Sequence, residues 1–145
     1  MKYWLDVFSP MAWEDSDKIS WSVSGFPEVR QKAVNRINIG DILICYVNKI
    51  SFWFGAIKTV SEPYRDDEIE IWREKFCPHR IKVIPLVILK LDNAIPAKSL
   101  IDKLELFEHL KNPVNWGAKL RTSPRELSEH DGKFILKELK AKSLG

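Results

Sequence analysis

Two apolar runs in the middle of the chain constrain the fold more than any other feature. Residues 42–47 (ILICYV) form a continuous apolar run, which is typical of a buried strand. Residues 52–60 (FWFGAIKTV) form a second β-rich run, and the short polar link between the two predicts a hairpin. Gly55, inside the second run, predicts a bulge or a close approach of another backbone. A buried hairpin is therefore expected at the centre of the chain.

Segments with strand and helix patterns flank this hairpin. Further strands are expected at residues 2–8, at 19–24 and within 76–91, where Pro85 marks an edge or a bend. Helices are expected after the Ser9-Pro10 start signal, at 26–35, within 95–110 and at 128–140. Residues 62–75 and 112–125 are expected to be loops. About five strands with a few short helices predict an α+β fold with a curved sheet or small barrel.

Length and composition limit the class of protein. The 145 residues fit one domain spanning residues 1–145. No apolar run reaches the roughly 18 residues that a membrane span requires, and the first residues lack a signal-peptide pattern. Two cysteines, Cys45 and Cys77, are too few for a disulfide scaffold and favour a reducing compartment. The expected localisation is therefore cytoplasmic.

The sequence carries no catalytic motif. It contains no glycine-rich phosphate loop and no G-x-S-x-G, H-E-x-x-H or C-x-x-C pattern. Cys77 and His79 lie two residues apart, but two ligands do not make a zinc site. We therefore expect that the protein binds neither a metal nor a cofactor and that it is not an enzyme. The alternative is an enzyme or small-molecule binder that uses Cys77, His79 and the acidic residues at 66–70.

Tryptophan is unusually frequent, with six residues in the chain. A small core accommodates one or two such side chains, so several are expected to face a ligand. We expect Trp4, Trp13 and Trp53 to be core residues, because two lie in strand patterns and the third in a helical turn.

An ordered series of short motifs resembles the EVE domain of the PUA-like superfamily. In chain order the series is Tyr3-Trp4-Leu5, Ser9-Pro10 with Trp13, Trp21-Ser22-Val23, Ile39-Gly40-Asp41, Tyr46-Val47, Phe54-Gly55, Ser61-Glu62-Pro63-Tyr64, Ile71-Trp72, Pro78-His79-Arg80, Pro85-Leu86, Asn115-Trp116-Gly117, Arg121 and Leu127-Ser128. Two features depart from the family pattern: Ser9 stands where the family often has Asn, and residues 21–30 form a slightly longer segment.

The resemblance implies a small PUA-like β-barrel of about five or six strands flanked by short helices. This fold is close to the YTH readers of N6-methyladenine. EVE domains occur alone and as N-terminal DNA-reading domains of McrBC-type modification-dependent restriction systems. The resemblance therefore implies a non-catalytic reader that flips a modified base, such as N6-methyladenine or a methylated cytosine, into an aromatic cage. DNA is favoured over RNA as the nucleic-acid partner. Further domains of a restriction NTPase are expected as protein partners.

The same resemblance suggests which residues form the site. By similarity to YTH readers, Trp21 and Trp72 are the two cage walls, and Phe76 is a candidate third wall. Ser9 and Ser22 are candidates for reading the base edge, by position only. Candidates for contacting the nucleic-acid backbone are Arg121, Lys119, Arg30 and Arg80, because such contacts use basic side chains. The alternative is a PUA-type RNA-binding module that recognises structured RNA through a basic face.

Overall fold

The computed structural model describes residues 1–108 and 113–145. Its strands are β1 (Tyr3–Phe8), β2 (Val23–Phe26), β3 (Ile42–Val47), β4 (Phe52–Thr59), β5 (Tyr64–Arg65), β6 (His79–Ile88), β7 (Ile95–Pro96) and β8 (Arg125–Leu127). Its α-helices are α1 (Pro10–Lys18), α2 (Gln31–Val34) and α3 (Glu129–Ser143). Short 3₁₀ helices span Glu28–Arg30, Leu91–Asn93, Ala97–Lys103, Glu105–Phe107 and Pro113–Leu120. No helix in this part of the chain is both long and apolar enough to cross a membrane.

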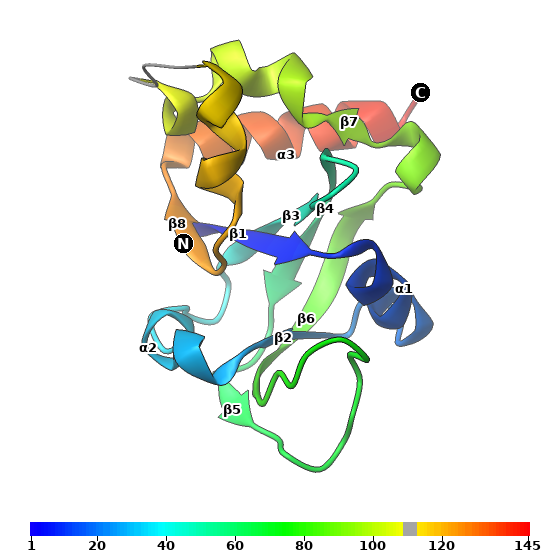
Figure 1. The fold of residues 1–145 in the computed structure, drawn as a ribbon, viewed down its shortest axis with the longest axis vertical. Helices are drawn as coiled ribbons and strands as arrows, with labels where there is room; N and C mark the ends of the chain where they lie inside the picture. The colour runs from blue at the N-terminus through cyan, green and yellow to red at the C-terminus, as the bar shows by residue number, and fades with distance from the viewer. Residues whose placement is uncertain (109–112) are drawn as a thin grey trace.

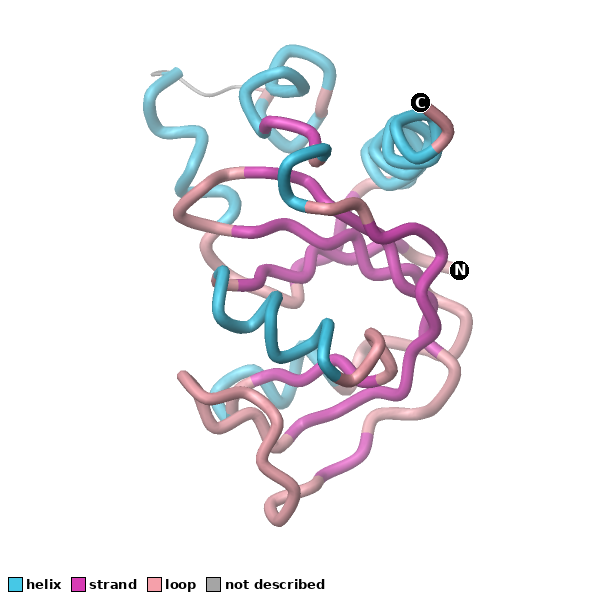
Figure 2. The backbone as a smooth tube through the Cα atoms, turned by 90° about the vertical axis from the view of Figure 1, so that its right-hand side faces the viewer, coloured by secondary structure: helices cyan, strands magenta, loops and turns pink. Residues whose placement is uncertain are grey.

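The strands form one curled sheet. Its main order is β2-β6-β4-β3-β1-β8, with β5 added to β6 and β7 added to β4. Strands β1 and β2 are not neighbours in this order, yet the Ser24 hydroxyl on β2 donates to Asp6 Oδ2 on β1 at 2.5 Å. The sheet therefore curls into a half-closed barrel, which brings β2, at one end of this order, close to β1, next to the other end (Figures 1 and 2). The predicted α+β fold, a small barrel with short flanking helices, is confirmed.

Strand β1 supplies side chains to two separate cores because successive residues of a strand point to opposite faces. Tyr3 and Leu5 belong to a core on the outer face of the sheet, together with Ile135 of α3. Trp4 and Phe8 belong to the core inside the curl. Helix α3 lies across the outer core near the C-terminus (Figure 1). The two faces of β1 are thus buried against different partners.

The central hairpin is confirmed in detail. Strands β3 and β4 pair antiparallel, and every residue of β3 is buried. The register shifts beside Gly55, and a Cβ atom there would lie 2.8 Å from the carbonyl oxygen of Val87. Pro85 lies at a second shift, where β4 pairs with β6. The bulge and the close backbone approach that the sequence predicted at Gly55 are therefore both present.

The helix caps are also confirmed. The Ser9 hydroxyl accepts from the backbone N–H of Ala12 at 3.0 Å, and Pro10 is the first residue of α1. The Ser128 hydroxyl accepts from the N–H of Asp131 at 3.1 Å at the start of α3. Each serine satisfies a backbone donor that the first turn of a helix leaves unpaired.

Two predicted segments differ from the structure. The strand expected at 19–24 begins only at Val23, because Ser20 and Trp21 both adopt a φ of +56° in a turn that follows α1. The helix expected at 26–35 is a 3₁₀ turn followed by the short α2, and Val29 is 87% exposed instead of packing inward.

The segment before α3 contains more structure than the expected loop. It holds a 3₁₀ helix at Pro113–Leu120 and strand β8, which pairs with β1. The 3₁₀ helices at Ala97–Lys103 and Glu105–Phe107 agree with the helical segment expected at 95–110. The end of that segment and the start of the loop expected at 112–125 lie outside the described residues.

Candidate functional site

A cavity of about 400 Å³ lies at the end of β1, inside the curl of the sheet. Its lining comes from β1, the first turns of α1, β2 and the residues after it, the turn after β3, the 72–77 segment and residues 121–123. Its volume lies within the range of pockets that bind small organic groups. Segments distant in sequence thus converge on one concave site.

Trp72 forms one wall of this cavity. It lies in the long segment between β5 and β6, and only 7% of its surface is exposed. Its indole Nε1 donates to the Ser16 hydroxyl of α1 at 3.1 Å. The ring packs against Gly25 of β2, where a Cβ atom would lie 2.2 Å from Cζ3 of the indole. The guanidinium of Arg80 lies 5.4 Å from the ring centroid. The indole is therefore held in position by contacts to three separate segments.

Two arginines anchor the segment that carries Trp72. Arg73 donates to the Asp15 carboxylate of α1 from its backbone N–H at 3.0 Å and from Nε at 2.7 Å. Arg80 pairs with Asp66 at 3.2 Å and donates to the carbonyl oxygens of Cys77, at 3.1 Å, and Ile69. Arg80 is only 3% exposed. Its guanidinium is thus engaged by the Asp66 carboxylate and by two backbone carbonyl groups of the protein.

Polar groups lie at the end of the cavity beside β1. Asp6 is buried and accepts from the Ser24 hydroxyl at 2.5 Å. Burial raises the pKa of Asp6 to about 7, while the hydrogen bond from Ser24 opposes this rise. The side chain of Asn48 also lines the cavity, and its buried Oδ1 has no hydrogen-bond partner among the described residues. These two side chains are the polar groups best placed to meet a ligand.

Basic side chains surround the cavity opening. Lys49, Lys75 and Arg121 line the cavity and are exposed. Arg30 is half-buried, and its guanidinium donates to the carbonyl oxygens of Ser123 at 3.2 Å and of Pro124 at 2.7 Å. We call Lys49, Lys75 and Arg121 the basic rim. This rim places positive charge at the cavity opening, where an anionic backbone can be attracted.

Four of the residues that the sequence suggested line this cavity. They are Trp72, Ser9, Arg30 and Arg121. The Ser9 hydroxyl already caps α1 and donates to Glu74 Oε1 at 2.5 Å. It is therefore engaged within the protein on both its donor and its acceptor side.

Trp21 lies elsewhere. It is 4% exposed, and its ring centroid lies 5.3 Å from that of Phe54 and 5.7 Å from that of Trp13, within the inner core. It borders a different hollow, together with Trp13 and residues 85–90. The cage of two facing indoles that the sequence suggested is therefore not the geometry of this cavity, because the left-handed turn at Ser20 and Trp21 directs the Trp21 ring into the core.

The remaining suggested residues also lie outside the cavity lining. Phe76 is 59% exposed. Ser22 is exposed and donates to the carbonyl oxygen of Ile19 at 2.7 Å. Lys119 is half-buried, and its carbonyl oxygen accepts from Arg125 at 3.1 Å.

Sequence reasoning missed several cavity residues, notably Asp6, Gly25 and Asn48. A signal for Asp6 was present, since it is the one charged residue in the otherwise apolar YWLDVF strand. Nothing in the local sequence marks Gly25 as the residue that contacts Trp72, because the two are distant in the chain. Asn48 and Lys49 fall in the hairpin turn, where polar residues are ordinary.

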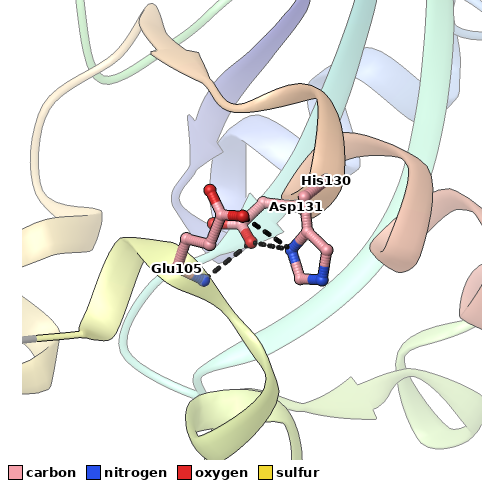
Figure 3. A group of neighbouring side chains, drawn as sticks. All are labelled: Glu105, His130 and Asp131. Carbon is pink, nitrogen blue, oxygen red and sulfur yellow. Dashed lines mark hydrogen bonds and ion pairs between the residues drawn. The ribbon is translucent and has the colours of Figure 1, made fainter.

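One cluster of potential metal ligands occurs among the described residues, at the start of α3 (Figure 3). His130 Nδ1 lies 2.9 Å from Asp131 Oδ1 and 3.6 Å from Glu105 Oε1. The buried Asp131 carboxylate accepts from the backbone N–H groups of Glu105 and Leu106, both at 2.8 Å. Both carboxylate oxygens of Asp131 thus attach the Glu105–Phe107 turn to α3, and the cluster has a structural explanation.

Cys77 and His79 do not form a nucleophile–base pair. His79 is buried, and its Nε2 lies 2.7 Å from Glu28 Oε1. Burial raises the pKa of Cys77 to about 11, the opposite of the shift that activates a catalytic thiol. This geometry does not favour thiol chemistry at the site.

Comparison with known proteins identifies the fold. No protein-family model and no curated protein matches the chain. The crystal structure of the Pho92 YTH domain in complex with m6A is similar, with a TM-score of 0.67 and 16% identity over 96% of this chain and 86% of that one.

Two further solved structures are similar. The YTH domain of Zygosaccharomyces rouxii MRB1, in complex with N6-methyladenosine RNA, has a TM-score of 0.66 and 19% identity over 95% of this chain and 87% of that one. The NMR structure of Rpa0253 from Rhodopseudomonas palustris has a TM-score of 0.58 and 15% identity over 97% and 94%. The chain therefore has a YTH-like fold.

Proposed function

We propose that this chain is a non-catalytic nucleic-acid reader that takes one modified base, flipped out of its strand, into the cavity beside Trp72. The observation that carries the proposal is the fixed indole of Trp72 on the wall of a 400 Å³ cavity whose opening is basic. Structural neighbours with the same fold include YTH domains in complex with m6A and with N6-methyladenosine RNA. N6-Methyladenine or a methylated cytosine is the proposed ligand.

The energetics of base flipping explain why a fixed aromatic wall matters. Extruding a base from a duplex costs a few kcal/mol. Stacking on an aromatic side chain returns roughly 1–3 kcal/mol per base. Phe8 and Phe26 also line the cavity, so Trp72 is not its only aromatic contact. A cavity that already holds its aromatic groups in place avoids the further cost of ordering them on binding.

Selectivity for a methylated base needs more than one buried methyl group. Burial of a methyl group contributes about 0.8 kcal/mol, which is about a fourfold preference. A larger preference requires that the unmodified base leave a buried donor unpaired, at about 1–3 kcal/mol. Phe8, Phe26 and Trp72 make part of the cavity apolar. An N–H group of the unmodified base that lies against these side chains would have no acceptor, which lowers the affinity for the unmodified base.

Backbone contacts are proposed for the basic rim. Arg121 was suggested by the sequence, and Lys49 and Lys75 join it in the structure. Arg30 is assigned a supporting role, since it holds the carbonyl groups of residues 123–124 beside the cavity. Arg80 and Lys119 are assigned no backbone contact, because the Arg80 guanidinium is buried and Lys119 does not line the cavity. Phe76 and Ser22, which also lie outside the lining, are assigned no contact with the base.

DNA remains the proposed partner on the resemblance to EVE domains, and RNA is the alternative that the YTH neighbours support. A role in targeting a restriction NTPase to modified DNA belongs to the same resemblance. DNA and RNA oligonucleotides can be compared in one experiment, because the cavity is proposed to hold the base and the rim to hold the phosphates, and both kinds of nucleic acid have these groups.

The test measures affinity by fluorescence anisotropy for DNA and RNA oligonucleotides that carry N6-methyladenine, 5-methylcytosine or no modification. We expect preference for one modified base, and a loss of roughly 5- to 150-fold on Trp72→Ala, since stacking is worth roughly 1–3 kcal/mol. Trp21→Phe is the control, because Trp21 packs in the inner core and not on the cavity. Thermal unfolding of each variant separates lost binding from lost folding.

Two outcomes would contradict the proposal. Equal affinity for all oligonucleotides, unchanged by Trp72→Ala, would mean that the cavity does not read a base. A steep salt dependence with a preference for structured RNA, again unaffected by Trp72→Ala, would favour a module that recognises RNA through its basic face.

A further inference from the structure

Asp6 places a carboxyl group where ionisation is unfavourable. The side chain is 2% exposed and lines the cavity from β1. Its only hydrogen bond among the described residues comes from the Ser24 hydroxyl and uses Oδ2. Oδ1 is therefore the oxygen left to meet a ligand. Loss of solvent disfavours a carboxylate at such a position and favours the neutral acid.

We infer that Asp6 reads the base as a neutral carboxylic acid, donating a hydrogen bond from Oδ1 to a ring nitrogen of an adenine-type or cytosine-type base. This inference rests on the function proposed above and specifies which bases the cavity accepts. It assigns to Asp6 a role in specificity that is separate from its contact with Ser24.

The chemistry of the base edges gives the discrimination. Adenine N1 and cytosine N3 are acceptors, and each lies beside an exocyclic N–H group. Methylation at adenine N6 or cytosine C5 leaves these acceptors intact. Guanine N1 and the N3 of uracil or thymine carry a hydrogen. This N–H donor would lie opposite the O–H donor of the acid, so neither donor would have an acceptor. A buried donor without an acceptor costs about 1–3 kcal/mol, which corresponds to roughly 5- to 150-fold in affinity.

A second polar group fits the same edge. The Oδ1 atom of Asn48 is buried, lies in a cavity-lining side chain and has no partner among the described residues. An exocyclic N–H group of adenine or cytosine can satisfy this acceptor. The carboxylic acid and the amide oxygen together supply one donor and one acceptor, which is the complement of an amino base.

The groups around Asp6 are compatible with its neutral form. Cys45 pairs with Asp6 across β1 and β3, and burial raises its pKa well above the usual value. Burial also raises the pKa of Cys77 to about 11, so both thiols stay neutral near pH 7. Arg80, on β6, points its guanidinium at Asp66 and at two loop carbonyl groups.

The charged groups on the other cavity segments have partners of their own or lie at the opening. Asp15 of α1 is paired with Arg73, and Glu74 accepts from Ser9. The turn after β3 contributes Lys49, the 72–77 segment Lys75, the residues after β2 Arg30, and the 121–123 segment Arg121. His79, on β6, is held by Glu28 and does not line the cavity.

The test compares the preferred modified oligonucleotide with an analogue that lacks the ring acceptor. The probe is 1-deaza-N6-methyladenine for an adenine-type target and 3-deaza-5-methylcytosine for a cytosine-type target. Wild-type protein is expected to bind the analogue roughly 5- to 150-fold more weakly. Between about pH 6 and about pH 8.5, wild-type affinity for the natural base is expected to fall as Asp6 ionises, by up to tenfold per pH unit above about pH 7.

Two variants make the result specific to Asp6. Asp6→Asn keeps a donor at this position, so it is expected to retain affinity for the natural base and to lose the pH dependence. Ser24→Ala removes the Ser24 contact but keeps the carboxyl group, so it is expected to retain the pH dependence. Thermal unfolding confirms that each variant is folded under the conditions of the binding assay.

The outcomes separate this inference from the proposed function. Wild-type protein that binds the modified base through Trp72, but binds the deaza analogue equally well, overturns the inference and leaves the function intact. So does a pH dependence that persists in Asp6→Asn. If no oligonucleotide is bound in a manner that depends on Trp72, the proposed function itself fails, and this inference with it.

Discussion

Gly25 and Trp72 pack against each other in the cavity lining, so that a Cβ atom at residue 25 would lie 2.2 Å from Cζ3 of the indole. The contact joins β2 to the segment between β5 and β6. It leaves no space for a side chain on β2 at this point. The position of the proposed stacking surface therefore depends on the residue type at position 25.

Gly25→Ala is expected to displace the Trp72 ring and weaken binding of the modified oligonucleotide. Overpacking of this kind costs about 1–3 kcal/mol, so the free energy of unfolding should fall as well. Gly117→Ala is the matched control, since nothing lies within 4 Å of a Cβ there among the described residues. Anisotropy and chemical denaturation measure the two effects. Unchanged affinity and stability in Gly25→Ala would show that the ring adjusts freely.

The basic rim should determine the salt dependence of binding. Lys49→Ala, Lys75→Ala and Arg121→Ala are each expected to reduce the slope of log K against log salt by about 1, with little change in base preference. Lys137→Ala and Lys140→Ala change the same charge on α3, outside the cavity lining, and serve as controls. Equal effects of rim and control variants would indicate general attraction to the whole protein surface.

Asp6 should make stability depend on pH in an identifiable direction. Burial raises its pKa to about 7 from the usual 3.8, so ionisation in the folded state is disfavoured. The cost is absent below about pH 4, grows as the pH rises to about 7 and is constant above that, where it reaches roughly 4 kcal/mol. Asp6→Asn should therefore gain stability relative to wild type as the pH rises through this window. Urea denaturation measures the free energy of unfolding of both proteins across this pH window. A constant difference between Asp6→Asn and wild type would contradict the raised pKa of Asp6.

Asp131 is expected to be essential for attaching the Glu105–Phe107 turn to α3. Its buried carboxylate accepts from the N–H group of Glu105 (Figure 3) and from that of Leu106. Asp131→Ala leaves both donors without this acceptor and should lower the free energy of unfolding by about 2–4 kcal/mol. Glu129→Ala, which removes an exposed pair with Lys133, should cost less than about 1 kcal/mol. A similar loss in both variants would argue against the anchoring role.

The fold was largely predictable because its strongest signals are local. The run at Ile42–Val47 and the glycine in the next strand predict the central hairpin and its bulge, and both are present. Ser9 and Ser128 predict the two helix starts from residues within one turn of each. Strand β8 was not predicted, because a three-residue segment acquires its strand character only by pairing with β1.

The site was less predictable because its geometry is not local. Trp72 was suggested by resemblance and lines the cavity, but its contacts with Ser16 and Gly25 join residues far apart in sequence. Trp21 was suggested on the same basis, and two consecutive residues with positive φ direct its ring into the core. A motif gives the residue type and its order in the chain, whereas the direction of a ring depends on backbone angles that the motif does not encode.

The alternation of β1 side chains between two cores limits which sequence changes this strand can tolerate during evolution. Removing or adding one residue before Asp6 would exchange the faces, turning the carboxyl group toward α3 and an apolar side chain toward Ser24. Folding and the proposed base recognition would then be lost together. If Asp6 contacts the base as inferred, its specificity is therefore more readily altered by substitution at position 6 than by a change in the length of this strand.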